Sequence, residues 1–401
     1  MKKILIVSHA MEVGGAETAL LGFLENIDTD KYEVELFLLR HSGELMKYIP
    51  TNIKLLPEIP QYAALVAPIG KVIGTGKWKV ALGRTVGKYK AKKRVKKLSF
   101  PMDNGVAVEY SHKYTRYVMP RINSKEYDLA ISFLTPHYFV AEKVSAKKKI
   151  AWIHTDYSTV KVDVESELKM WSKYDYIASI SENVSESFLE IFPLLKDRLI
   201  LIENIMPIRY INKLVNRFSV ENEMPKDGSI KLLSIGRFSP QKKFDEVPAI
   251  CRKIRELGIN VKWYLIGYGG EEQLIRQKIS EEQMEDYVII LGKKENPYPY
   301  IKACDIYLQP SRYEGKSVAV REAQALNKPV IITNYTTAQS QLKDGYDGII
   351  VPMDIQGSVE GICAVLRDKK LQQTLIENTK KSDYTNTGEI KKLYEILGNK
   401  N

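Results

Sequence analysis

The sequence predicts an α/β protein made of two Rossmann-like, doubly wound domains that face each other across a cleft. At 401 residues the chain is too long for one ordinary core, and its 44% hydrophobic and 27% charged residues are typical of globular proteins. Short runs rich in β-branched residues alternate with helix-like stretches, which is the pattern of parallel βαβ units.

Five strands are expected in each half of the chain. The runs that predict them are 3–8, 34–39, 129–134, 148–154 and 176–181, then 230–236, 261–267, 288–292, 305–310 and 329–333. Between the halves, near 207–228, polar residues and prolines replace the alternation of strand-like and helix-like stretches. We therefore expect a first domain over 1–206 and a second over 207–384, with a helix of about 385–401 packing back on the first. In open α/β sheets ligands bind beyond the carboxyl ends of the strands, so functional residues are expected in the loops there.

The cysteine content and the apolar runs indicate a cytoplasmic protein. The three cysteines are widely spaced and form neither a disulfide framework nor a metal-ligand pair. No stretch approaches the ~20 apolar residues that span a bilayer. The short apolar run at the start ends in a glycine turn, which favours a buried first strand over a signal peptide.

The net charge of +11 is concentrated in one segment. Between Gly70 and Leu98 there are no acidic residues, and the cations are Lys71, Lys77, Lys79, Arg84, Lys88, Lys90, Lys92, Lys93, Arg94, Lys96 and Lys97. Four apolar side chains fall near helical spacing among them: Trp78, Leu82, Val86 and Tyr89. This pattern resembles an interfacial amphipathic helix, although Gly83 and Gly87 weaken the helix prediction.

An anionic membrane surface is the partner that this segment favours. The membrane contacts expected are Lys71, Lys77, Trp78, Lys79, Arg84, Lys92, Lys93 and Arg94. The alternative is a solvated basic helix. No nucleic-acid partner is expected, because no recognition motif accompanies the basic residues.

Two classical nucleotide-binding motifs are excluded. The glycine turn after 261–267 has Glu272 where a dinucleotide fingerprint has its third glycine, and a carboxylate there would repel a pyrophosphate. The tripeptide at 315–317 resembles the end of a P-loop, but Pro310 occupies the position of the upstream glycine.

Two other turns have residues that suit a phosphate. Gly14 and Gly15 follow the first strand and open a helix, where free backbone N–H groups can bind an anion; the alternative is a simple tight turn. Arg237 and Lys242 lie in the loop after the strand at 230–236, where a guanidinium and an ammonium suit a diphosphate. Taken alone, these two could equally be surface cations.

Glu314 and Glu322 lie eight positions apart on either side of a predicted helix start. A carboxylate can accept two hydroxyl hydrogen bonds, as vicinal sugar or ribose hydroxyls require. Gly315 lets the backbone approach a ligand at the positive end of the helix. The alternative for Glu322 is an ordinary exposed helix residue.

These motifs resemble those of the retaining GT-B glycosyltransferases of family 4. The stretch 310–330 reads P-S-x-x-E-G-K-S-x-x-x-x-E-A-x-A-x-x-x-P-V, "GGAE" begins at Gly14, and "IGRFSPQKKFD" spans 235–245. Lys243 stands where glycine is usual in the last of these. The resemblance covers nearly the whole chain and implies two Rossmann-like domains, the second of which binds most of a nucleotide-sugar.

The resemblance also implies roles for single residues. Glu314 would contact the transferred sugar, Glu322 the ribose, and Arg237 with Lys242 the diphosphate. His154, which ends a first-domain strand, would hydrogen-bond the donor sugar, whereas His9 and His137 are expected to be structural. The expected catalytic residues are His154, Glu314, Arg237 and Lys242. The expected donor-binding residues are Gly14, Gly15, Gly236, Arg237, Lys242, Gly292, Lys293, Glu314, Gly315, Lys316, Ser317, Val318 and Glu322.

The resemblance implies transfer by front-face substitution, in which the leaving diphosphate takes the acceptor proton. No cofactor or metal is expected beyond a UDP- or GDP-type nucleotide-sugar, and the early D-x-D at 28–30 is interpreted as a turn. The first domain, 1–206, is expected to bind the acceptor. This acceptor is expected to be a lipid-linked saccharide in bacterial capsule or exopolysaccharide synthesis, at the inner face of the cell membrane. The alternatives are a GT-B nucleotide-sugar epimerase and a non-catalytic partner subunit; the joint presence of Arg237, Lys242, Glu314 and Glu322 argues against the subunit.

Overall fold

The computed structural model describes residues 1–12, 14–65, 67–100, 105–314 and 316–398. The chain divides into two compact units. The N-terminal unit comprises Met1–Pro207 and Asn386–Asn401, and the C-terminal unit comprises Ile208–Thr385.

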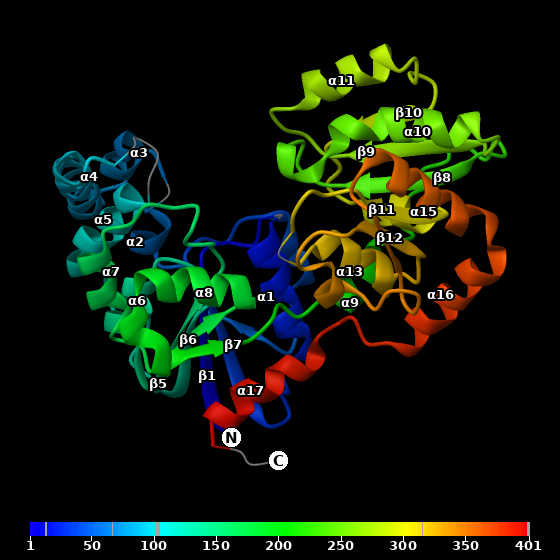
Figure 1. Ribbon diagram of the computed structural model, residues 1–401. Helices are drawn as coiled ribbons and strands as arrows, with labels where there is room; N and C mark the ends of the chain where they lie inside the picture. Colours follow the sequence, from blue (N-terminus) through cyan, green and yellow to red (C-terminus); the bar gives the residue numbers. More distant parts are fainter. Residues whose placement is uncertain (13, 66, 101–104, 315, 399–401) are drawn as a thin grey trace. The chain divides into compact units, whose positions relative to one another are not determined.

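The N-terminal unit, coloured mainly blue to green in Figure 1, contains a seven-stranded parallel sheet. The strand order is β3-β2-β1-β4-β5-β6-β7. Its strands are β1 (Lys2–Ser8), β2 (Tyr32–Leu38), β3 (Lys54–Leu55), β4 (Glu126–Ser132), β5 (Ser145–Ile153), β6 (Tyr176–Ser179) and β7 (Leu199–Leu201). Its helices are α1 (Gly15–Asn26), α2 (Pro60–Ala63), α3 (Ile69–Gly74), α4 (Trp78–Leu98), α5 (Val106–Thr115), α6 (His137–Lys143), α7 (Val164–Trp171), α8 (Glu182–Ile191) and α17 (Ile390–Ile396).

The C-terminal unit contains a six-stranded parallel sheet in the order β10-β9-β8-β11-β12-β13. Its strands are β8 (Ile230–Ile235), β9 (Val261–Ile266), β10 (Val288–Gly292), β11 (Ile306–Gln309), β12 (Val330–Thr333) and β13 (Ile349–Val351). Its helices are α9 (Ile208–Leu214), α10 (Val247–Glu256), α11 (Glu272–Glu281), α12 (Tyr298–Ala303), α13 (Val318–Ala325), α14 (Ala338–Gln341), α15 (Ile355–Arg367) and α16 (Lys369–Lys381).

Both strand orders reverse direction beside the first strand of their unit. The reversal lies between β1 and β4 in one sheet and between β8 and β11 in the other. This is the Rossmann arrangement, and the crevice at such a reversal is where doubly wound sheets bind ligands. The predicted fold class of two Rossmann-like α/β domains is confirmed.

The central strands are buried because helices cover the sheets. Ile4 to Val7 of β1 are at most 1% exposed, as expected of parallel strands with both faces covered. All ten predicted strands are present, within a few residues at their ends. The structure adds β3, β7 and β13, which are edge strands of two or three residues.

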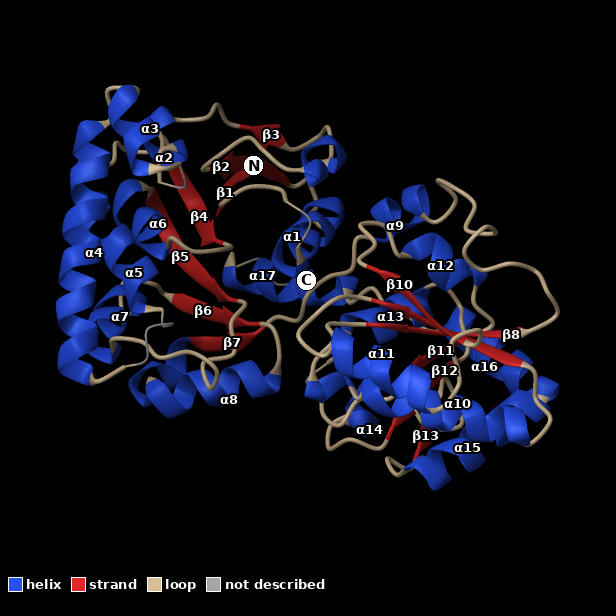
Figure 2. Cartoon of the chain, turned by 90° about the horizontal axis from the view of Figure 1, so that it is seen from above, coloured by secondary structure: helices blue, strands red, loops and turns tan. Residues whose placement is uncertain are grey.

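The basic segment folds into α4, a helix of 21 residues that packs beside α5 (Figure 2). The predicted helix is therefore confirmed, and the structure shows that its two glycines lie at the contact with α5. A Cβ on Gly87 would lie 2.6 Å from the carbonyl oxygen of Tyr110, and one on Gly83 would lie 3.0 Å from the Thr115 methyl group. The two glycines let the helix axes approach closely.

The C-terminal helix α17 packs on the N-terminal sheet. Tyr394 stacks on Tyr32 with 4.9 Å between ring centroids, and its hydroxyl accepts a hydrogen bond from the Asp28 N–H at 2.8 Å. The Asp28 carboxylate accepts from the N–H groups of Asp30 and Lys31. The D-x-D at this point is thus a turn. In the part of the chain that the structure describes, no helix combines the length and apolar character needed to cross a bilayer.

We predict that Gly87→Ala destabilises the protein, although alanine is the better helix former. The added methyl group meets the backbone of α5, so the helices must separate, at a cost of about 1–3 kcal/mol. Thermal unfolding should show a lower Tm. The matched control is Gly70→Ala in α3, where nothing lies within 4 Å of the new Cβ and the Tm should not fall. An equal change in both variants would contradict the packing role.

Candidate active site

The reversal point of the C-terminal sheet brings together two of the predicted site residues. Lys242 follows β8 and Glu314 follows β11, the strand beside it. The Lys242 ammonium lies 2.5 Å from Glu314 Oε1, and the two side chains are 15% and 6% exposed. A Cβ on Gly236 would lie 2.9 Å from Lys242 Cε, so this glycine leaves the path that the lysine side chain follows.

A chain of buried hydrogen bonds positions Glu314. The Ser311 hydroxyl donates to Glu314 Oε1 at 2.6 Å, and the Gln309 amide donates to Ser311 at 2.9 Å. Tyr307 donates to the Gln309 side-chain oxygen at 2.8 Å. The Gln241 amide adds a 3.3 Å contact to Glu314 Oε2. These positioning residues were not predicted, although polar side chains at alternate positions of a buried strand, Tyr307, Gln309 and Ser311, are a signal that the sequence contains.

Arg312 joins the two loops that carry Lys242 and Glu314. Its guanidinium donates to both carboxylate oxygens of Asp245, at 2.9 and 3.1 Å, and to the carbonyl oxygen of Pro240 at 2.6 Å. Its backbone N–H donates to the carbonyl oxygen of Gln241 at 2.8 Å. Such bidentate contacts fix geometry more strongly than single ones.

Lys243 occupies the position where the family pattern has glycine. Its φ of 59° lies in the left-handed region, which costs a side chain roughly 1 kcal/mol. The side chain is buried, and its ammonium lies 2.8 Å from Glu246 and also donates to the carbonyl oxygen of Met353. These contacts offset the backbone strain and keep the loop in the conformation that glycine would adopt.

Arg237 is exposed at the start of the same loop. The glycine turn after β9 packs closely against this loop. A Cβ on Gly267 would lie 1.9 Å from the carbonyl oxygen of Gly236. The Gly267 N–H donates to the carbonyl oxygen of Gly292, whose φ is 72°, at 3.0 Å. Lys293, next in the chain, is exposed and lies over the Tyr268 ring. This glycine turn does not match the dinucleotide-binding fingerprint. Its role is to pack against the loop that follows β8.

The helix after Glu314 begins at Val318, with Ser317 as its N-cap. The Ser317 N–H donates to Gln341 Oε1 at 2.7 Å. This N–H group is therefore not available to a phosphate, although Ser317 is among the residues predicted to bind the donor. The N–H groups of the first helical turn, from Val318 on, have no intrahelical acceptor and remain candidates. Lys316 is exposed, and Gly315 lies outside the described residues.

Glu322 lies about one turn into α13, which begins at Val318. It is half-buried and accepts a hydrogen bond from the Tyr298 hydroxyl at 2.9 Å. Burial raises the pKa of Glu322 to about 7, although the hydrogen bond from Tyr298 works against this shift. An exposed helix residue would not have this environment.

The N-terminal unit holds the remaining predicted residues. Gly14 caps α1, but a Cβ there would lie 2.4 Å from Glu17 Oε2, so a carboxyl group already covers this helix end. A phosphate at Gly14 and Gly15 would meet that carboxyl group. His154 directly follows β5; its Nε2 has no hydrogen-bond partner among the described residues. Burial lowers the pKa of His154 to about 4, so the ring is neutral at pH 7.

Two of the predicted membrane contacts, Arg84 and Arg94, bind other residues of the N-terminal unit instead. Arg84 donates to the carbonyl oxygens of Ala64 and Ala67, and Arg94 makes a bidentate contact with Asp163 at 2.7 and 2.9 Å. We therefore correct their assignment, because these internal partners satisfy both guanidinium groups. Lys71 lies in α3, and its side chain is outside the described part of the structure.

Most of the other predicted membrane contacts lie on α4 and are solvent-exposed. Trp78, Leu82 and Tyr89 are 56%, 55% and 57% exposed. Lys79 lies over the Trp78 ring and Lys93 over the Tyr89 ring, Lys92 is exposed, and Lys77 is half-buried. The buried residues of this helix are Val80, Ala81, Gly87 and Ala91.

We predict that Glu322→Gln makes stability less dependent on pH. Because the folded-state pKa is raised, the protonated carboxyl favours folding below the unfolded pKa, and this contribution is lost as pH rises through about 7. The variant should gain Tm relative to the parent between pH 5 and pH 8, by about 2–4 °C. Scanning calorimetry at both pH values checks this. Exposed Glu377→Gln on α16 is the control; an equal response of both variants would contradict the prediction.

Residues 216–382 match the family model described as "Glycosyl transferases group 1". Over its whole length the chain also resembles a crystal structure of HepE from Anabaena in complex with UDP and glucose. The TM-score is 0.63 at 15% identity, with 99% of this chain and 100% of that chain covered. This likeness confirms the GT-B fold.

Three curated relatives are similar in sequence to parts of this chain. An uncharacterized glycosyltransferase of Methanocaldococcus jannaschii is 26% identical over 65% of this chain and 72% of its own length. The amylovoran biosynthesis glycosyltransferase AmsK of Erwinia amylovora is 27% identical over 34% of this chain and 35% of its own length.

The third is a Campylobacter jejuni 4-alpha-N-acetylgalactosaminyltransferase that is named for a diphospho-undecaprenol-linked saccharide. It is 25% identical over 51% of this chain and 54% of its own length. The matches to the last two thus span only a third to a half of those relatives. The family model thus covers less than half of this chain, within the C-terminal unit, and the structural likeness over the whole chain shows the fold.

Proposed function

We propose that this protein is a retaining hexosyltransferase that moves a hexose-type sugar from a UDP- or GDP-type nucleotide-sugar to a lipid-linked saccharide. The observation that carries the proposal is the contact between Lys242 and Glu314 at the reversal point of the C-terminal sheet. It places a cation and a carboxylate where a doubly wound sheet binds a nucleotide.

The reaction requires stabilisation of charge on the leaving group. The bond between the anomeric carbon and the phosphate oxygen breaks, the bond to the acceptor oxygen forms, and the acceptor proton passes to the leaving phosphate. Negative charge grows on the diphosphate, and Arg237, Lys242 and the first turn of α13 would stabilise it there. Preorganised groups of this kind add no reorganisation cost during the step.

The two carboxylates would orient the two sugar rings of the donor. Glu314 accepts from Lys242, Ser311 and Gln241, which hold it in one rotamer for contact with the hydroxyls of the transferred sugar. Glu322, held by Tyr298, would accept from the ribose. Neutral His154 could either donate or accept a hydrogen bond to the donor sugar.

We propose that no metal takes part. The cations of the β8 loop and the helix end supply the positive charge that a metal would otherwise provide.

The acceptor proposal rests on the relatives. One is named for a polyprenyl-diphosphate-linked saccharide and another for the synthesis of a surface polysaccharide. We therefore propose a lipid-linked acceptor in bacterial capsule or exopolysaccharide synthesis, at the inner face of the cell membrane.

The exposed face of α4 would hold the protein on that membrane. Trp78, Leu82 and Tyr89 recur at helical spacing on the side opposite the contact with α5, and exposed lysines flank them. Aromatic and aliphatic groups can enter the interface while lysines contact anionic headgroups, each worth about 1 kcal/mol.

We predict that Glu314→Gln lowers turnover at least ~100-fold, because the carboxylate contact made with the sugar in the transition state is lost. Donor hydrolysis and transfer, measured with UDP- and GDP-sugars in buffer with EDTA, check this. The parent enzyme should remain active in EDTA, and strong loss of its activity would contradict the proposed metal independence.

Exposed Glu377→Gln is the control for that experiment and should keep the parent turnover. Calorimetric titration with UDP and GDP provides a separate test. If the parent chain binds neither nucleotide, a non-catalytic subunit explains the site better than an enzyme does.

We also predict that Lys92→Gln with Lys93→Gln weakens binding to anionic vesicles about tenfold or more, because two headgroup contacts are lost. Vesicle sedimentation with anionic and neutral lipids measures this. Exposed Lys369→Gln with Lys370→Gln on α16 removes the same charge elsewhere and should bind as the parent does. Equal binding of the parent to both kinds of vesicle would refute the electrostatic part.

A further inference from the structure

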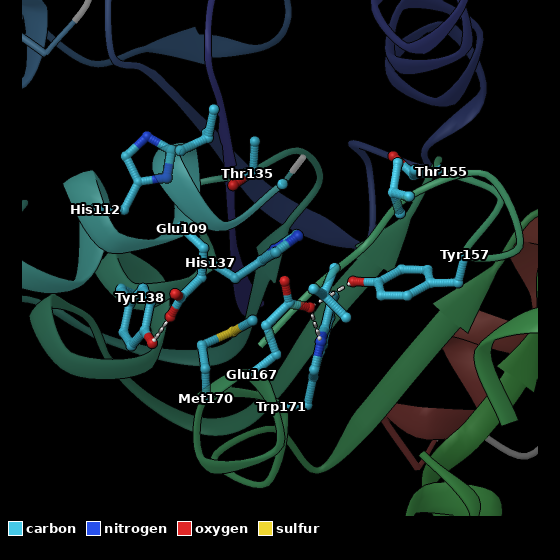
Figure 3. Close-up of a pocket in the computed structure, with 14 residues that line it drawn as sticks. Glu109, His112, Thr135, His137, Tyr138, Thr155, Tyr157, Glu167, Met170 and Trp171 are labelled. Atoms are coloured by element: carbon cyan, nitrogen blue, oxygen red, sulfur yellow. Dashed lines mark hydrogen bonds between the residues drawn. The ribbon is translucent and has the colours of Figure 1, made fainter. Parts of the chain in front are cut away.

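The N-terminal unit contains a pocket of about 200 Å³ beyond the carboxyl ends of β4 and β5 (Figure 3). Its walls come from α5, α6, α7 and the loop between β5 and α7. Drug-sized ligands usually occupy ~300–1,000 Å³, so this pocket suits a single ring.

Two buried carboxyl groups line the pocket. Glu109, 9% exposed, accepts from the Tyr138 and Ser166 hydroxyls through Oε1, whereas its Oε2 is buried without a hydrogen-bond partner among the described residues. Glu167, 6% exposed, accepts from the Tyr157 hydroxyl at 2.8 Å and from the Trp171 indole at 3.2 Å, both at Oε2 (Figure 3). Burial raises the pKa of both groups, that of Glu167 to about 7.

The other lining groups are neutral. His137 donates or accepts at Ser132 through Nδ1, and its ring lies 4.7 Å from the Trp171 ring. Burial lowers the pKa of His137 to about 3, so it carries no charge at pH 7. Trp171 and Met170 supply apolar surface.

This chemistry excludes some ligands and favours others. A phosphate or a carboxylate would find no cationic partner among the lining residues, which include two acids and no lysine or arginine. A polyhydroxyl ring matches the pocket, because the second oxygen of each acid, Glu109 Oε2 and Glu167 Oε1, can accept from a hydroxyl and the apolar walls can meet the C–H faces. The buried Glu109 Oε2 is the strongest sign, since an unpartnered buried carboxyl oxygen is costly.

We propose that this pocket binds a neutral sugar ring of the acceptor saccharide, with Glu109 and Glu167 accepting hydrogen bonds from its hydroxyls. The proposal rests on the proposed function and adds the place and the charge of the acceptor subsite. One face of α5 packs on basic α4 and the opposite face carries Glu109, so a single helix separates a cationic surface from an acidic pocket.

The test uses the full chain and four methyl glycosides, those of glucose, galactose, N-acetylglucosamine and N-acetylgalactosamine. Saturation-transfer NMR measures their binding at millimolar concentration. The measurement is made at pH 8, where Glu167 is mostly ionised. We expect at least one to bind, and Glu167→Gln to weaken it about five- to tenfold, because charged acceptors form stronger hydrogen bonds than neutral ones. Thr155→Trp, at an exposed lining position, should abolish binding by filling the pocket.

The matched control is Glu165→Gln, two positions away on α7, whose side chain is 69% exposed and pairs with Lys169. It should bind the glycosides as the parent does. Binding of none of the four to the parent, or equal binding by the parent, Glu167→Gln and Thr155→Trp, overturns the proposal.

Titration of the same samples with UDP and GDP separates this inference from the proposed function. All variants should bind nucleotide like the parent, because none alters the C-terminal unit. If nucleotide binding fails in the parent while glycoside binding depends on Glu167, the proposed transfer is refuted and the sugar pocket stands.

Discussion

The site in the C-terminal unit depends on the ion pair between Lys242 and Glu314. Each side chain comes from a loop after one of the two strands at the sheet reversal, so the pair also joins these loops. The surrounding contacts serve to keep it in place: Arg312 ties the loops together, and the hydroxyl of Ser311 fixes the carboxylate. A buried pair of this kind adds little net stability, because desolvation offsets the attraction. Its value lies in holding two reactive groups in a fixed geometry.

The two candidate binding regions have opposite electrostatic character. The C-terminal loops present Arg237, Lys242 and a helix N-terminus, which suit an anionic diphosphate. The N-terminal pocket presents Glu109 and Glu167, which suit uncharged hydroxyls. The two regions therefore favour chemical groups of different charge.

Local patterns in the chain were enough to predict the central strands and the residues that end them. Lys242 and Glu314 were found because parallel strands place their carboxyl ends at one edge, whatever the details of packing. The short strands β3, β7 and β13 were missed, since two or three residues have no periodicity. The hydrogen bond from the Ser317 N–H to Gln341 could not be predicted, because the two residues are 24 positions apart in the chain.

The features that could not be predicted all depend on partners far away in the chain. Arg84 and Arg94 look like surface cations until Ala67 and Asp163 are seen beside them. Glu109 and Glu167 are 58 positions apart in separate helices, and nothing near either one marks it as buried. The role of Gly87 also depends on a distant partner. A glycine is expected to weaken a helix, but here it allows α4 to pack closely against α5. Since α5 also forms a wall of the pocket, one glycine on the basic helix contributes to the shape of the acidic site behind it.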